Sequence, residues 1–290
     1  MATLEHDRAG AAPWLLSGPA LLLFGALLLV PLVLTLMLSF HAFSDTAGVQ
    51  AAWTLQNYVQ VVTDPYYGTI FLRTAGLACA VTLASIVLGV PETIVLARMK
   101  QPWQSLCLLV VLGPLLISVV VRTLGWQILL GNNGVLNDAL QALHITSEPV
   151  RLVFTMTGTI IALTHVLVPF MVMSVWATLQ KLDPQVEWAG RSLGGSPAKV
   201  FRRVVLPQIL PGVLSGSIIV FALSASAFAT PALIGGRRLK VVATAAYDEF
   251  LGTLNWPLGA SIAVLLLVAN VAIVAGCSRL AERRFRQVFE

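Results

Sequence analysis

VEWAGRSLGGSPAKVFRRVVLPQILPG, residues 186–212, is a basic segment punctuated by glycine and proline within a mostly apolar chain. Just before it, Asp183-Pro184 supplies an N-cap acceptor and a proline at the first helical position. Gly194-Gly195 can end that helix, because glycine readily adopts the left-handed conformation, and Ser196-Pro197 begins a second helix by the same logic as the first. We therefore expect two short amphipathic helices joined by a tight turn, with Leu206-Pro207 ending the second.

Helices of about ten residues are marginally stable alone in water, so the apolar faces of this segment must pack against something. Three surfaces could cover them: the membrane-spanning part of the same chain, the lipid surface, or a soluble partner. The physical pattern by itself leaves these three open.

The composition around this segment is that of an integral membrane protein. The chain has 290 residues, of which 57% are hydrophobic and only 11% charged, whereas soluble domains carry about 25% charged residues. The net charge of +5 comes from short basic clusters beside apolar runs, which carries topology information and indicates no nucleic-acid partner. The three cysteines lie in apolar runs without paired spacing, so we expect no metal site.

Six apolar windows reach the length of about 20 residues that a spanning helix needs. They are residues 14–40, 71–97, 103–130, 152–179, 213–229 and 258–280. Runs of this length without alternation argue against a barrel. We expect an all-α polytopic membrane protein with six transmembrane helices, a retained first span, and a single transmembrane domain over residues 1–290.

The distribution of lysine and arginine predicts the orientation. The richer set of loops carries Arg8, Arg98, Lys100, Lys181, Arg191, Lys199, Arg202, Arg203, Arg279, Arg283, Arg284 and Arg286. The opposite side and its span ends carry Arg73, Arg122, Arg151, Arg237, Arg238 and Lys240. Because positive loops stay inside, an even number of spans places both termini in the cytoplasm. On the outer side, Asn137 is expected to cap a short helix with Asp138 in its first turn.

The second half of the basic segment resembles a known signature. The permease subunits of binding-protein-dependent ABC importers carry Glu-Ala-Ala, three residues, Gly, nine residues, Ile, one residue and Leu-Pro. Here Gly194 is followed by nine residues, then Val204, one residue, and Leu206-Pro207. The Glu-Ala-Ala positions hold Trp188, Ala189 and Gly190, and the neighbouring acid, Glu187, lies one residue early.

The resemblance implies a type I ABC importer permease fold whose loop, residues 183–207, docks onto separate ATP-hydrolysing subunits. The coupling residues it implies are Glu187, Trp188, Ala189, Gly190, Gly194, Ser196, Val204, Leu206 and Pro207. The sequence has no GxxxxGK[ST] motif, so ATP and Mg are expected to bind two partner subunits, with no cofactor in this chain. We accordingly expect a transport subunit and no enzyme.

Several further stretches resemble the spermidine/putrescine permease branch, in particular its first permease subunit. They include WTLQNY, VRTLGWQILLGNNGVLND and TPALIGG. The branch implies a small polar solute, polyamine-like as the leading candidate and an opine, amino acid or aminophosphonate as the alternative. It also implies a second, related permease subunit, a periplasmic solute-binding protein and the bacterial inner membrane.

The expected translocation path combines this resemblance with physical arguments. The resemblance implies that the fifth span lines the path, which selects Ser224, Ser226 and Phe228. Glu92 is an acid well inside a span, either a path residue or one that faces water or a cation near the interface. Arg122 would favour an anionic group over a bare diamine, unless it snorkels to the headgroups. Trp126 is either a path residue or part of an interfacial belt, and His165 is more typical of helix packing.

Two other classes fit less well. A self-sufficient secondary transporter would show internal repeats and ionisable residues at mid-membrane. A membrane-embedded enzyme would show a nucleophile with a base, or metal ligands, yet HExxH and GxSxG are absent and the four histidines are scattered. The sequence therefore favours an importer subunit.

Overall fold

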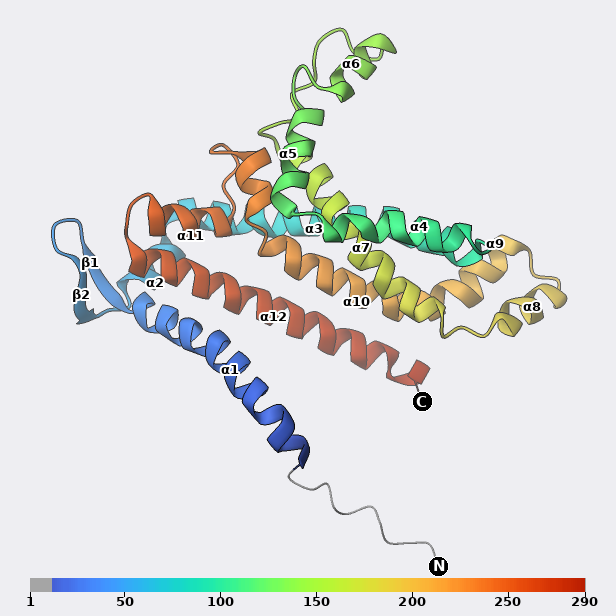
Figure 1. Ribbon diagram of the computed structural model, residues 1–290, viewed down its shortest axis with the longest axis horizontal. Coiled ribbons are helices and arrows are strands. Elements are labelled where there is room, and N and C mark those ends of the chain that lie inside the picture. Colours follow the sequence, from blue (N-terminus) through green and yellow to red (C-terminus); the bar gives the residue numbers. More distant parts are fainter. Residues whose placement is uncertain (1–11, 290) are drawn as a thin grey trace, which may run out of the picture. The chain divides into compact units, whose positions relative to one another are not determined.

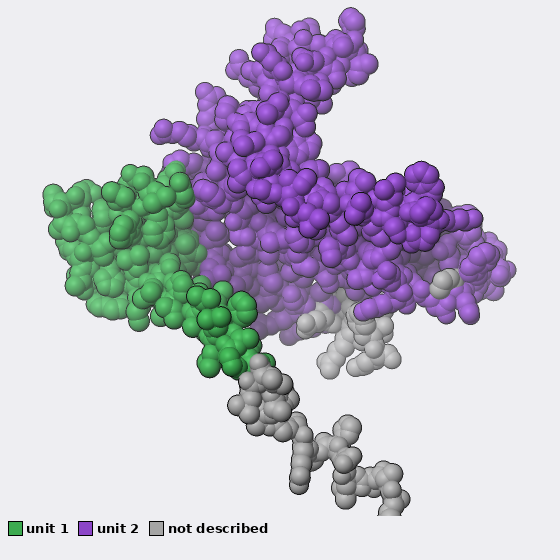
Figure 2. Space-filling model, in the orientation of Figure 1, with its two compact units in different colours: residues 1–63, 246–264 green, residues 64–245, 265–290 purple. Residues whose placement is uncertain are grey.

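The computed structural model describes residues 12–289, which are predominantly helical (Figure 1). Arg8, used above for the orientation, lies outside the described residues. The chain divides into two compact units, residues 1–63 with 246–264 and residues 64–245 with 265–290 (Figure 2). The expected all-α class is confirmed, with one short β-hairpin added.

The first unit holds the amino-terminal helix and the hairpin. Its elements are α1 (Ala12–Ser39), β1 (His41–Ser44), β2 (Gly48–Trp53) and α2 (Gln56–Thr63), followed later in the chain by the start of α12. The strands pair antiparallel through a turn in which Gly48 has φ +69°, a conformation that glycine adopts without strain. The buried Asn57 donates from Nδ2 to the carbonyls of Ser39 and His41, both at 2.9 Å, and so fixes α2 to the end of α1.

The second unit carries the main helical core. Its elements are α3 (Pro65–Arg98), α4 (Trp103–Leu112), η1 (Gly113–Leu116), α5 (Val119–Leu129), α6 (Val135–Ala142), α7 (Met156–Leu179), α8 (Pro184–Ser192), α9 (Pro197–Val200), η2 (Phe201–Val205), α10 (Leu206–Ala225), η3 (Pro231–Gly235), α11 (Val242–Leu251) and α12 (Trp256–Phe289), of which α11 and α12 pass between the units. Helices α3, α7 and α10 pack against one another, and Leu77, Met171 and Ile209 are fully buried between them.

Small and hydroxylated residues let these three helices approach closely. A Cβ atom added at Gly216 would lie 2.8 Å from Sδ of Met171, so only glycine fits there. Ser174 donates from Oγ to the carbonyl of Gly212 at 2.8 Å, a bond between α7 and α10. Such contacts drive helix association in lipid, where apolar burial alone does not.

Among residues 12–289, five helical stretches are apolar and long enough to cross a membrane, and a sixth is sharply bent. The five are Ser17–Ser39, Pro65–Arg98, Met156–Leu179, Pro197–Ala225 and Trp256–Ala281. The sequence placed the third span at residues 103–130. The structure has two helices there, Trp103–Leu116 and Val119–Leu129, and the chain turns by 102° between them, which the sequence did not predict.

The bend has a local cause. Pro114 lies in the first turn of η1, where its ring removes a backbone donor and the helix tightens to a short 3₁₀ turn. Ile117 and Ser118 then take extended backbone, with ψ of 138° and 132°. The helix restarts at Val119 and directs α5 away from the line of α4 (Figure 1).

The prediction for Asn137 was also wrong. Helix α6 begins after Gly134, with Asp138 in its first turn as expected, and Asn137 lies inside it, fully buried. Its Nδ2 donates to the carbonyls of Gly131 and Val150, at 2.8 and 3.1 Å, and its Oδ1 accepts from the backbone N–H of Val150 at 2.8 Å. The amide therefore holds residues 131–150 together from within.

Candidate functional site

The loop between α7 and α10 begins with a well-capped short helix. Asp183 accepts from the backbone N–H of Gln185 at 2.9 Å, with Pro184 at the first position of α8, as the sequence predicted. Gly194 has φ +81° and ends the helix, also as predicted. Its N–H donates to the carbonyl of Arg191 at 2.9 Å, so the turn is closed by the chain itself.

The second short helix departs from the prediction. Ser196 does cap α9, accepting from the N–H of Lys199 at 3.4 Å. However, Leu206-Pro207 does not end that helix: α9 continues through the π-helical turn η2 directly into α10. Pro207 lies in the first turn of α10, where a missing N–H costs least, and the wider π turn upstream accommodates its ring. The loop is thus rigidly continuous with a spanning helix.

Two glycines bring the short helices together. Val200 is 3% exposed and packs at the turn, where a Cβ atom at Gly190 would lie 3.3 Å from both its methyl groups. A Cβ atom at Gly195 would lie 2.8 Å from one of them. Val204 lies just beyond, 3.7 Å from the same position at Gly190. Gly190 and Val204 of the signature therefore hold the loop in shape.

The outer face of α8 is apolar and uncovered. Trp188 is 70% exposed and Leu193 is 89% exposed, whereas soluble surfaces seldom leave such side chains together in water. Ala189 and Ser192 between them are exposed as well, and so are Ser196 and Pro207. The basic side chains of Lys199, Arg202 and Arg203 are exposed on the adjoining stretch.

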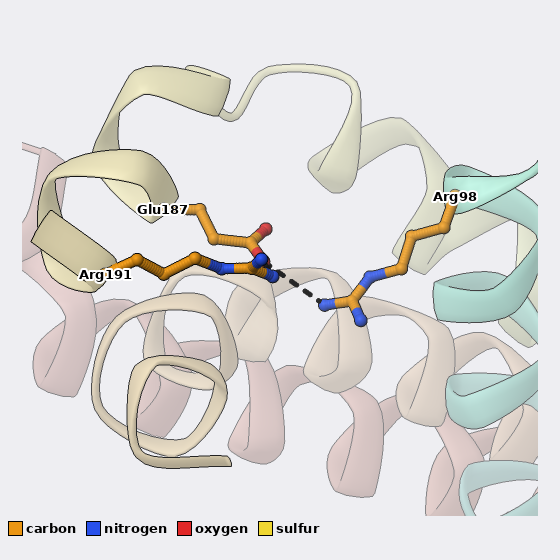
Figure 3. A network of polar contacts seen from close by, with 3 residues as sticks. All are labelled: Arg98, Glu187 and Arg191. Carbon is orange, nitrogen blue, oxygen red and sulfur yellow. Dashed lines mark hydrogen bonds and ion pairs between the residues drawn. The ribbon is translucent and has the colours of Figure 1, made fainter. Parts of the chain in front are cut away.

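Glu187 faces the other way, toward its own chain. Its Oε1 accepts from Nη2 of Arg191 at 2.7 Å and lies 3.6 Å from Nη2 of Arg98 (Figure 3). Arg98 lies in the last turn of α3, so the carboxylate links α8 to the end of a spanning helix. Sequence reasoning counted Arg98 and Arg191 only as topology signals; the i,i+4 spacing of Glu187 and Arg191 was the one local signal for this contact.

A cavity of about 230 Å³ lies beside this contact, open to solvent on one side. It is lined by Ile94, Ala97, Arg98, Leu179, Leu182, Asp183, Val186, Glu187, Val204, Val205 and Gln208. Helix α8 therefore packs on Val200 of α9 and is linked to α3 by the ion pair of Glu187 with Arg98, with open space between α8 and the ends of α3, α7 and α10.

The residues expected to line the path do not form a single site, and Arg122 and Trp126 lie on α5. Arg122 is only 9% exposed, and its Nε and Nη1 atoms have no hydrogen-bond partner among residues 12–289. Trp126, one turn further on α5, donates from Nε1 to Nδ1 of His165 on α7 at 3.0 Å. The hydroxyl of Thr123 meets that of Thr230 at 3.1 Å, which joins α5 to the start of η3 and was not foreseen. These contacts gather polar groups where α5, α7 and η3 meet.

The other path residues differ in their exposure and bonding. The carbonyl of Phe228 accepts from the N–H of Ala232 in η3 at 3.0 Å, next to that cluster. Ser224 is 1% exposed and its Oγ is buried without a partner, whereas Ser226 bonds back to the carbonyl of Ala222 at 2.8 Å. Phe228 is 39% exposed. Glu92 is half-buried on α3 beside Pro91 and has no ion pair among the described residues, so it lies apart from the rest.

These features define a class of protein. A bundle of long apolar helices that carries a capped, exposed two-helix loop is a polytopic membrane protein. Within residues 12–289 no cluster of histidine, cysteine or carboxylate side chains could hold a metal ion.

Comparisons with known proteins identify the family. The chain belongs to the binding-protein-dependent transport system inner membrane components, whose family profile matches residues 11–287. It is 31% identical over 239 residues to the spermidine/putrescine transport system permease protein PotB of Escherichia coli (strain K12), covering 82% of this chain and 86% of the relative. It is 33% identical over 236 residues to the inner membrane ABC transporter permease protein YdcU of the same organism, covering 76% and 74%.

The fold agrees with solved structures. A bacterial alginate ABC transporter in complex with an alginate pentasaccharide-bound periplasmic protein superposes with a TM-score of 0.78 at 16% identity, over 93% of this chain and 94% of the other. The chain is therefore a multi-pass permease subunit of a binding-protein-dependent ABC importer in the inner membrane.

Proposed function

We propose that the loop of residues 183–207 is the docking site for ATP-binding subunits, two per transporter, which carry ATP and Mg and hydrolyse the nucleotide. The observation that carries this proposal is the exposed face of Trp188 and Leu193 on a loop that caps and closes itself. The continuity of α9, η2 and α10 supports it, because a push on the loop acts directly on a spanning helix. The proposed coupling residues also include the signature residues already placed and Ser196, together with Glu187, which acts through its ion pair with Arg98 of the same chain.

The permease works in this proposal as half of a pair. A second, related permease chain completes the translocation path, and a periplasmic binding protein delivers the solute to the outer side. We place both termini in the cytoplasm, on the side of the α8–α9 loop, from the distribution of lysine and arginine. The proposed path residues are Ser224, Ser226, Phe228, Trp126, Arg122 and Glu92.

For the solute, the first candidate is a polyamine. The support is the 31% identity to a permease named for spermidine and putrescine over most of both chains. An amine would be stabilised along the path by aromatic faces and carboxylates, a role open to Trp126 and Glu92.

One observation favours a second candidate, an amino-bearing solute that also has an acidic group, such as an amino acid, an opine or an aminophosphonate. Arg122 is buried with two guanidinium nitrogens unpaired and has no ion pair in the described part of the chain. A buried cation is costly unless an anion pairs with it.

Co-expression with a cognate ATP-binding subunit tests the docking proposal. The wild-type chain should retain that subunit on the membrane, and Gly194→Trp should release it, since Gly194 has φ +81°. The matched control is Gly48→Trp, because Gly48 also has positive φ and open space around it but lies in the hairpin. Retention by Gly194→Trp equal to that of Gly48→Trp would contradict the proposal. Uptake of labelled spermidine and of labelled amino acids by the full system then distinguishes the two solutes.

A further inference from the structure

Helix α8 presents two different faces, one paired with its own chain through Glu187 and one that carries the exposed Trp188. Consecutive residues of an α-helix point about 100° apart, so the side chains of Glu187 and Trp188 leave α8 in different directions. The carboxylate of Glu187 is directed to Arg98 and Arg191 of its own chain (Figure 3). The indole of Trp188 is 70% exposed.

The exposed face is a coherent apolar surface. Trp188 and Ala189 on α8, and Leu193 in the turn before Gly194, are all exposed. The side of α8 that faces its own chain carries Gly190 instead, which packs on Val200. The helix therefore keeps its close-packed contact and its carboxylate inward, and leaves its largest side chain outside.

The surroundings of this face indicate the chemistry of its occupant. Lys199, Arg202 and Arg203 are exposed beside it, and Arg191 retains 47% side-chain exposure. A complementary surface is an apolar socket for the indole with carboxylates at its edge. Figure 1 shows α8 beyond the ends of α3 and α7, past the spanning part of this unit, where a soluble subunit can reach it.

We propose that Trp188, with Leu193, is the apolar anchor that selects the cognate ATP-binding subunit, and that Glu187 serves as an internal strut to α3 and makes no contact with that subunit. The inference rests on the proposed docking function. It means that the indole occupies the position at which the signature has a carboxylate, and that the carboxylate one residue earlier does not replace it. The socket on the cognate subunit is accordingly apolar, without a buried cation for that position.

The consequence is specificity. An ATP-binding subunit whose groove is built for a carboxylate loses the charge-assisted hydrogen bonds to that group, and the indole returns only a cation–π contact of different geometry. Such a subunit should bind this permease poorly, although the folds are shared.

The test is the affinity of the purified permease in nanodiscs for its cognate ATP-binding subunit. Trp188→Ala should weaken binding by about 30-fold, as expected for a central aromatic anchor, and Trp188→Phe should restore most of it. Glu187→Gln should change binding by less than about fivefold, since an exposed ion pair contributes little. The matched control is Trp53→Ala, because Trp53 is 68% exposed but lies in the first unit.

The outcomes distinguish failure of the docking function from failure of the Trp188 anchor. If the wild-type chain binds no ATP-binding subunit, the docking function fails and the anchor fails with it. If the wild type binds but Trp188→Ala binds equally well, or Glu187→Gln loses binding instead, only the anchor is overturned.

A lipid role for the indole is a further outcome that would overturn the anchor. In that case brominated lipid would quench the tryptophan fluorescence of the wild type more than that of Trp188→Phe. The difference would persist when the ATP-binding subunit is bound. Absence of that difference supports the protein partner.

Discussion

The α3–α7–α10 core and the α8–α9 loop both carry large apolar side chains, but the core buries them and the loop exposes them. In the core, Leu77, Met171 and Ile209 are fully buried. In the loop, Trp188 and Leu193 are mostly exposed, although the backbone around them is capped and closed. The difference indicates that the core is complete within the chain, whereas the loop is shaped to be completed by another protein.

The largest expected effect contrasts one buried and one exposed side chain. Met171→Ala should lower the free energy of unfolding by about 2 kcal/mol or more, because the cavity term remains in a lipid environment even though transfer from water does not contribute. Trp188→Ala should change it by less than about 0.5 kcal/mol. SDS-induced unfolding in mixed micelles measures both. Equal losses would mean that the indole packs on its own chain.

A smaller effect concerns the two equivalent N-caps. Asp183 and Asp64 each accept from a backbone N–H two residues later at 2.9 Å, ahead of a proline. Asp183→Ala should destabilise α8 by about 1 kcal/mol and speed its amide hydrogen exchange about fivefold, because α8 has little tertiary packing. Asp64→Ala should leave exchange in the middle of α3 unchanged. Slow exchange in α8 of Asp183→Ala would show that tertiary contacts hold the loop.

The smallest effect compares two serine hydroxyls. Ser174 joins α7 to α10 through the carbonyl of Gly212, whereas the hydroxyl of Ser192 bonds, among residues 12–289, to the carbonyl of Trp188 in its own helix. Ser174→Ala should lower the free energy of unfolding by about 0.6 kcal/mol, a typical value for an interhelical bond in a membrane protein. Ser192→Ala should leave it unchanged within the error of the same SDS titration. If Ser192→Ala lowered the free energy of unfolding more than Ser174→Ala does, the loop and not the core would depend on its serine bond for stability, which contradicts the comparison.

Features that depend on residues close together in the sequence could be predicted, and features that depend on distant residues could not. The positions of the spans follow from long apolar runs, and the caps at Asp183, Gly194 and Ser196 are local, so both were predicted, whereas the bend in the third span was not. The prolines did not show from the sequence which of them breaks a helix. Pro114 lies at the bend, whereas Pro91 and Pro169 lie inside continuous helices. Sequence alone could not distinguish these cases, because neighbouring helices decide whether a broken hydrogen bond is tolerated.

Other features depend on contacts between distant parts of the chain. The pairing of Glu187 with Arg98 joins α8 to α3, and no local pattern encodes it. The contact of Trp126 with His165 joins α5 to α7 and likewise required the three-dimensional structure. Asn137 sits in a sequence suited to a cap, yet the backbone of Gly131 and Val150 uses its amide instead.

The most direct test of the account is cross-linking from the loop in intact membranes. Leu193→Cys is introduced after Cys79, Cys107 and Cys277, which are free thiols in the structure, are replaced by serine. A short thiol-to-amine cross-linker should join position 193 to the ATP-binding subunit, and should join nothing to Met171→Cys in the buried core. A cross-link from position 193 to this chain alone, with the ATP-binding subunit present and assembled, would contradict the central claim that the loop docks a separate motor.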